Sequence, residues 1–229
     1  MFLVRRGAAT LALTFVLLGS AISVNADTPW SNPSGTASYF DWENGHNSNT
    51  NLFGSPTLVG GNAFRFSPTD FRAESVDGVS GTANDIAAWD AIAHPGHQFS
   101  EIRIIEHGDY SISGTHEDNE VEVTTLLRAD DNDLIWQWMQ DFTTIEYTEE
   151  GTGLWDIDMS LDLENTFPPI TDVHITLENN LVAISGGPGN VTWIEKKFAG
   201  AIIDVILIPE PSTLALIVFG GFALIRRRR

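Results

Sequence analysis

Trp155-Asp156-Ile157-Asp158-Met159-Ser160-Leu161-Asp162-Leu163 alternates apolar and polar side chains without interruption. Successive side chains of a β-strand point to opposite faces, so this period of two predicts a half-buried strand with one acidic face. The same alternation recurs in the stretches Glu101–Ile104, Glu120–Leu127 and Asp172–Leu177. The chain is therefore expected to fold as an all-β protein built from antiparallel sheets.

Turn-forming residues separate these stretches. Breaks are predicted at Val76–Gly78 and His107–Asp109, a hairpin turn at Glu178–Asn180, and a longer turn at Ser185–Asn190. Short strands spaced by such turns indicate a β-sandwich of jelly-roll or immunoglobulin-like shape. Val191–Phe198 and Ala201–Leu207 are expected to be its last strands.

One segment allows a different local structure. Ile86, Trp89 and Ala93 fit one face of a helix, so a short helix over Asp85–Ala93 remains an alternative to a strand there.

The first 26 residues have the features of a secretory signal peptide. Arg5 and Arg6 supply a positive start, and an apolar run over Ala8–Leu18 follows. Val24 and Ala26 place small side chains where a signal peptidase reads its substrate, which predicts cleavage after Ala26.

The last residues combine three signals in a fixed order. Pro209-Glu210-Pro211 is followed by an apolar run over Thr213–Ile225 and then by Arg226, Arg227, Arg228 and Arg229. The apolar run predicts a short transmembrane helix that begins after the prolines. Because arginines flanking such a helix stay on the cytoplasmic side, the Pro-Glu-Pro triplet is expected on the outer face.

This tail resembles the PEP-CTERM protein-sorting signal of Gram-negative bacteria. The resemblance implies recognition by exosortase, an integral-membrane enzyme that removes the helix and releases the protein toward the cell surface, often alongside exopolysaccharide production. The expected organisation is a signal peptide at 1–26, a β-sandwich ectodomain at 27–208 and a sorting signal at 209–229. The protein is thus expected in the inner membrane before processing, and at the cell surface or outside the cell afterwards.

Composition excludes several classes of protein. The net charge is −19, and thirty of the 31 acidic residues lie between Asp27 and Asp204 with only six basic ones. Such a surface repels phosphate, so a nucleic-acid partner is not expected. Cysteine is absent, which excludes disulfides, thiolate metal sites and a cysteine nucleophile.

No set of residues carries a recognisable catalytic pattern, and no cofactor is expected. The strongest metal candidate is calcium at Asp130, Asp131 and Asp133, because clustered oxygen ligands suit that ion. The run lacks the spacing of a complete calcium loop, and an acidic turn explains it equally well. The acidic face of Asp156, Asp158 and Asp162 is expected to be solvated.

These features favour an exported, non-enzymatic protein with a structural or adhesive role in a surface or polysaccharide matrix. One alternative is a carbohydrate-binding module in which Trp136 and Trp138 stack on sugars, although burial of both in the core is the competing interpretation. A second alternative is a secreted glycoside-acting enzyme that uses a pair of carboxylates.

Overall fold

The computed structural model describes residues 26–132, 138–164 and 169–209. Every regular element in these ranges is a β-strand, and all strand pairs are antiparallel. The predicted all-β antiparallel fold is confirmed. The predicted transmembrane helix, the terminal arginines and the signal peptide up to Asn25 lie outside the described residues. Within them, no helix is long and apolar enough to cross a membrane.

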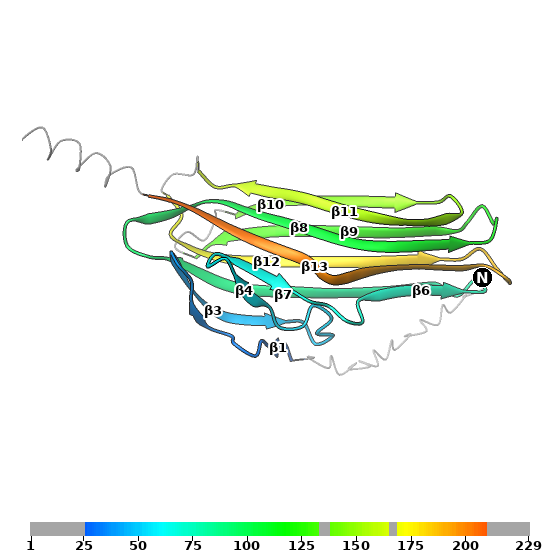
Figure 1. Ribbon diagram of the computed structural model, residues 1–229, viewed down its shortest axis with the longest axis horizontal. Helices are drawn as coiled ribbons and strands as arrows, with labels where there is room; N and C mark the ends of the chain where they lie inside the picture. Colours follow the sequence, from blue (N-terminus) through cyan, green and yellow to red (C-terminus); the bar gives the residue numbers. More distant parts are fainter. Residues whose placement is uncertain (1–25, 133–137, 165–168, 210–229) are drawn as a thin grey trace, which may run out of the picture.

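The strands form two sheets, and Figure 1 shows the longest strands running along the long axis of the molecule. Sheet A has the order β1-β3-β7-β12-β9-β10, with β2 also paired to β3. Its strands are β1 (Thr28–Pro29), β2 (Gly35–Thr36), β3 (Phe40–Asn47), β7 (Gly81–Ala93), β9 (Glu120–Asp131), β10 (Trp138–Tyr147) and β12 (Asp172–Ile184).

Sheet B has the order β11-β8-β13-β5-β4, with β6 also paired to β13. Its strands are β4 (Thr57–Val59), β5 (Ala63–Phe66), β6 (Arg72–Val76), β8 (His97–Ser113), β11 (Gly151–Asp162) and β13 (Val191–Pro209). The two strands predicted at the end of the chain are thus one strand, β13, with a register shift between Lys196 and Ala201.

Pairing among the last eight strands is nested. β9 pairs with β10, β8 with β11, β7 with β12 and β6 with β13, so each outer pair encloses the inner ones along the chain. Two further pairings, β12 with β9 and β13 with β8, join these pairs into the two sheets. β12 therefore lies between β7 and β9, and β13 lies between β8 on one side and β5 and β6 on the other.

The core lies between the sheets and follows the alternation seen in the sequence. In β11, Trp155, Ile157, Met159 and Leu161 are buried while Asp156, Asp158 and Asp162 are exposed. Aromatic rings fill the part of the core nearest the first strands, where Trp30, Phe40, Phe64 and Trp89 contact one another. Burial of such rings supplies much of the hydrophobic stabilisation of the fold.

The helix proposed over Asp85–Ala93 is wrong, because this segment belongs to β7. Ala87, Trp89 and Ala91 are all buried at a spacing of two, and the segment pairs with β12 and β3. Asp85 begins it with a buried carboxylate that accepts hydrogen bonds from Thr50 Oγ1 and from the backbone N–H of Phe53. Pairing on both sides overrides the helical spacing of its apolar residues.

Two predicted turns are also wrong. Glu178–Asn180 lies inside β12, and His107–Asp109 lies inside β8. Asn179 is fully buried and hydrogen-bonds to side chains of other strands, so its polar group is satisfied without a turn. Gly108 stays extended because Trp155 and the backbone of β13 occupy the space that a side chain would need.

The other two turns are confirmed. β6 ends at Val76, and Asp77 (φ 54°) and Gly78 (φ 90°) reverse the chain into β7. Ser185–Asn190 joins β12 to β13, and its end residues Ser185 and Asn190 are buried.

Candidate functional site

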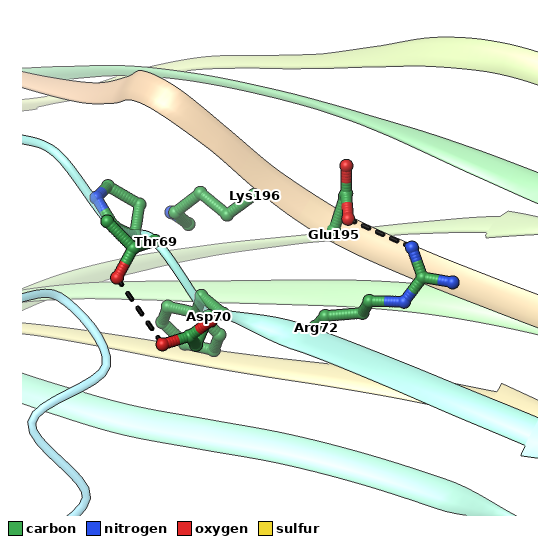
Figure 2. A pocket seen from close by; sticks show the side chains of 7 residues that line it. Thr69, Asp70, Arg72, Glu195 and Lys196 are labelled. Carbon is green, nitrogen blue, oxygen red and sulfur yellow. Dashed lines mark hydrogen bonds and ion pairs between the residues drawn. The ribbon is translucent and has the colours of Figure 1, made fainter.

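A pocket of about 650 Å³ opens beside β13, where the segment before β6 passes over it. Figure 2 shows its lining, which consists of Pro68, Thr69, Asp70, Phe71, Arg72, Glu195 and Lys196. The segment before β6 supplies Pro68–Phe71, and the paired strands β6 and β13 supply Arg72, Glu195 and Lys196. The pocket therefore combines a charged rim with a floor that reaches the core.

Arg72 organises the rim. Its guanidinium donates a hydrogen bond to Glu195 at 3.0 Å, lies 3.4 Å from Glu74, and stacks 4.3 Å above the Trp193 ring. These side chains are about one-third to one-half exposed, so solvent screens the ion pairs and each contributes little to stability. The arrangement fixes the orientation of a half-exposed tryptophan on the outer face of sheet B.

Lys196 forms the floor and is fully buried. Its Nζ lies 2.6 Å from Glu106 Oε1, and the side chain of Glu106 is also fully buried. The contact is an ion pair with angles poor for a directed hydrogen bond, since neither atom has a hydrogen-bond partner. Around Nζ lie the rings of Phe53, Phe71 and Trp155, with centroids 5.2–5.8 Å away.

The second oxygen of Glu106 connects the ion pair to sheet A. Thr125 Oγ1 donates to Glu106 Oε2 at 2.6 Å, and Asn179 Nδ2 lies 3.1 Å from the same oxygen. Asn179 Nδ2 also donates to Thr125 Oγ1 at 2.7 Å. Lys196, Glu106, Thr125 and Asn179, which we call the buried polar cluster, thus bridge the two sheets through the core.

Burial of the cluster follows from strand phase. Lys196 continues the inward series of Thr192 and Ile194, and Glu106 continues that of Ile102 and Ile104. Thr125 and Asn179 occupy equivalent inward positions in β9 and β12, where they face each other across the strand pair. The alternation of each strand alone places all four side chains inside. Continuing that alternation from the apolar residues onto these polar ones is the signal by which the sequence could have revealed the cluster.

The electrostatics of the cluster are governed by loss of water. Burial lowers the pKa of the Lys196 ammonium, while the charge of Glu106 and its contact with Nζ act in the opposite direction and recover only part of the shift. The neutral amine therefore forms more readily in the cluster than on an exposed lysine.

The acidic face of β11 is solvated, as predicted, and two of its carboxylates have partners on β8. Arg103 of β8 donates from Nε to Asp158 at 2.8 Å, and His107 lies 2.5 Å from Asp156. Hydrogen bonds and charge from Arg103 hold the pKa of Asp158 below its usual range. The neighbouring strand thus neutralises part of the charge on this face.

The calcium candidates do not converge. Asp130 and Asp131 belong to β9, so they point to opposite faces, and Asp131 is buried. Asp130 is held by Arg128 at 2.7 Å. Asp133 lies outside the described residues, and in the part of the chain that is described no three carboxylates or histidines gather closely enough to hold a metal.

The predicted tryptophan platform of Trp136 and Trp138 stays a prediction. Trp136 and the side chain of Trp138 lie outside the described part of the chain. Trp193 instead forms one wall of a shallow depression of about 420 Å³ with Asp109, Thr152 and Leu154. Leu154 is 69% exposed.

Comparison with known proteins locates the sorting signal. Residues 207–229 match the family model of the PEP-CTERM protein-sorting motif. This chain carries that motif. The PEP-CTERM motif is the recognition signal for exosortase, so the chain is an exported, exosortase-processed surface protein.

Other comparisons are less informative. No curated protein matches the chain. Among solved structures, a chain of the Cowpea mosaic virus top component, a naturally occurring empty particle, aligns with 61% of this chain and 84% of its own length. The two are 10% identical and their TM-score is 0.26.

The PEP-CTERM motif begins inside the folded domain. β13 ends at Pro209, so Leu207, Ile208 and Pro209 belong both to the matched segment and to the last strand. Their backbones pair with Phe99, Gln98 and His97 of β8. Glu210, Pro211 and Arg226–Arg229 lie outside the described residues, as does Val24 of the predicted peptidase site, and the assignments of these residues stay predictions.

Proposed function

We propose that this protein is a non-enzymatic structural component of the bacterial surface, associated with exopolysaccharide after exosortase processing. The PEP-CTERM motif carries this proposal, because it directs a folded domain to the outside of the cell. The continuity of β13 with the motif supports it further, since no long linker separates the domain from the membrane before processing. The signal peptide at 1–26 would start the same route.

The domain belongs, in our proposal, to the jelly-roll class of sandwiches. The nested pairs from β9·β10 out to β6·β13 support this choice over an immunoglobulin-like sandwich. Eight strands wound in this way form two four-stranded sheets, which is the jelly-roll arrangement. Jelly rolls serve as structural and as sugar-binding domains, so this class fits a matrix protein and a carbohydrate-binding module equally well.

The carboxylates of the pocket favour a non-enzymatic role. A glycoside-acting enzyme needs one carboxyl kept protonated by an apolar environment and a second one facing it. Asp70 is exposed and accepts a hydrogen bond from Thr69, while Glu195 is held by Arg72. Neither side chain has the apolar surroundings that an acid catalyst requires.

Replacement of Pro209-Glu210-Pro211 by three alanines tests the proposal. The variant is expected to stay uncleaved in the inner membrane, whereas the parent reaches the cell surface. Deletion of Arg226–Arg229 should instead weaken topology and retention, because those charges hold the tail in the cytoplasm. Fractionation and intact mass measure both effects, and the exposed turn variant Pro188→Ala serves as control. Surface delivery of the alanine variant at parental levels would contradict the sorting role.

A carbohydrate-binding module is the second candidate, and the orientation of Trp193 favours it. A tryptophan held by a cation beside an exposed leucine offers a flat apolar surface for a sugar ring. Because the protein is strongly acidic, the ligand class would be a neutral polysaccharide rather than an anionic one.

Trp193→Ala is the matching test. The variant is expected to lose at least two- to tenfold in affinity for neutral polysaccharide from the native host, since one stacking contact contributes about 0.5–1.5 kcal/mol beyond the buried area. Phe142→Ala is the control, because Phe142 is an exposed aromatic residue on sheet A. Equal binding by both variants in a polysaccharide pull-down would exclude the Trp193 surface.

A further inference from the structure

We propose that Lys196 and Asn179 join in an intramolecular amide bond, with Glu106 as the acid–base catalyst of its formation. The bond would link β13 in sheet B to β12 in sheet A through the core. The proposal rests on the buried polar cluster, in which an amine, a carboxyl group and a side-chain amide lie in sequence within a closed apolar environment.

Glu106 contacts both reacting groups. One of its oxygens lies 2.6 Å from Lys196 Nζ, and the other lies 3.1 Å from Asn179 Nδ2. A carboxyl group placed between a nucleophile and an acceptor can carry protons from one to the other. The flexible stem of Lys196 allows Nζ to move from the carboxyl group to the adjacent amide carbon.

The surroundings favour the reactive form of each group. The aromatic rings of Phe53, Phe71 and Trp155 exclude water from Nζ, and burial lowers the pKa of the ammonium. Transfer of a proton from Lys196 to Glu106 leaves a neutral, nucleophilic amine beside a neutral acid. This transfer removes two charges from a dry site, which is the main cost of burying the ion pair.

The reaction balances without an outside reagent. Nζ attacks Cγ of Asn179 while Glu106 donates its proton to the amide oxygen, which gives a tetrahedral intermediate. Glu106 then takes a proton from the attacking nitrogen and passes it to the amide nitrogen, which leaves as ammonia. The proton on the oxygen returns to Glu106 as the new amide carbonyl forms, and Glu106 passes it to the ammonia. One C–N bond forms and one breaks, the ammonia carries away the lysine's extra proton as ammonium, and Glu106 returns to the carboxylate.

Asn179 is suited to be the acceptor because its amide oxygen is buried without a hydrogen-bond partner and can therefore take a proton from Glu106. The two ends of a side-chain amide are distinguished by their hydrogen bonds. Once Glu106 is protonated, rotation of the Asn179 side-chain amide about its Cβ–Cγ bond brings this oxygen, in place of Nδ2, toward the acid. Thr125 is a positioning residue, since it hydrogen-bonds both Glu106 and Asn179.

Mass spectrometry of the full chain, folded and then denatured, tests the proposal directly. The parent is expected to weigh about 17 Da less than its sequence predicts, the mass of one ammonia. Cleavage after glutamate locates the bond, because it places Asn179 on the peptide Asn179–Glu195 and Lys196 on the separate peptide that begins at Lys196. The proposal expects these two peptides to remain joined.

Amine labelling in denaturant gives a second readout. Lys197 is expected to react with the reagent while Lys196 does not, which makes the adjacent lysine an internal control in the same molecule. Glu106→Gln, which keeps the size of the side chain but removes the acid, should restore the full mass and the labelling of Lys196. Lys197→Arg should leave the mass loss unchanged.

Three results would overturn the proposal. A full-mass parent with a reactive Lys196 would show a simple ion pair. A loss of about 18 Da, one water, would mean that Glu106 itself is the acceptor. A mass loss that persists in Glu106→Gln would exclude its catalytic role. The parent measurement decides the central point even if a variant fails to fold.

Discussion

Asp90 shows how a single carboxylate ties several strands of sheet A together. It accepts hydrogen bonds from Asn44 at 2.6 Å and Asn132 at 3.4 Å, and it lies 2.7 Å from His174 Nδ1. Partial burial acts to raise the pKa of Asp90, but these partners outweigh it and hold the pKa below its ordinary value of 3.8. The ionised form is therefore the one that stabilises the fold.

The stability that Asp90 contributes is expected to depend on pH. A carboxylate with a lowered pKa in the folded state contributes stability that is present above its unfolded pKa and is lost as pH falls through the folded value. Asp90→Asn is expected to reduce the free energy of unfolding at pH 7 by about 1–2 kcal/mol. The difference from the parent should shrink in urea unfolding at pH 3 and below.

Exposed Glu149→Gln is the control for this experiment, since it removes one negative charge from the surface. A constant difference between parent and Asp90→Asn across the whole pH range would show that lost packing, not charge, causes the effect.

At the scale of the element, β8 depends on a glycine in its middle. A Cβ at Gly108 would overlap the backbone oxygen of Glu195 in β13 and the ring of Trp155 in β11. Both obstacles belong to the neighbouring strands and cannot turn aside. Gly108→Ala is therefore expected to lower the free energy of unfolding by about 3 kcal/mol, the upper end of ordinary overpacking.

Thermal unfolding measures this change against Thr152→Ala, a substitution at an exposed position of β11. A stable Gly108→Ala protein would mean that β8 and β13 separate more easily than their long pairing implies.

The strands could be predicted where side-chain alternation is unbroken by turn-forming residues, as in β11. Prediction failed at Asn179 and Gly108, because both residue types favour turns when judged by neighbours in sequence alone. Their partners are contributed by other strands: Glu106 lies 73 residues from Asn179. Such contacts override local preference, and one sequence does not reveal them.

Prediction of the candidate site from the sequence failed for the same reason, because the contacts that make the site come from other strands. The charged residues that the sequence made conspicuous, such as Asp130, turned out to be paired across or along strands. Lys196 and Glu106 attracted no notice as members of an acidic chain, yet both side chains are fully buried. The only signal of this burial in the sequence is that both residues occupy inward-facing positions of their strands. Which positions face inward can be told only once the strand ends are known.

At the scale of the whole molecule, the acidic composition raises the question of calcium. Because no three carboxylates or histidines in the described part of the chain gather closely enough to hold a metal, chelation is expected to shift the melting temperature by no more than a few degrees. Calorimetry with and without EGTA measures this, and magnesium provides the comparison ion. A large, calcium-specific fall would reveal a site that includes Asp133 or another residue outside the described ranges.

Nested pairing also sets the order in which the strands can pair during export. A chain that leaves a membrane pore with its first residues leading exposes β8 well before β13, the strand that pairs with β5, β6 and β8. Sheet B therefore stays divided, with the inward edge of β8 unpaired, until the final segment has crossed. Long-range closure of this kind is slow, and an open edge invites association with other chains. Attachment of the last residues to the membrane would hold each molecule apart from its neighbours while the newly emerged β13 pairs with β5, β6 and β8, so the tail would act as a folding tether as well as an address.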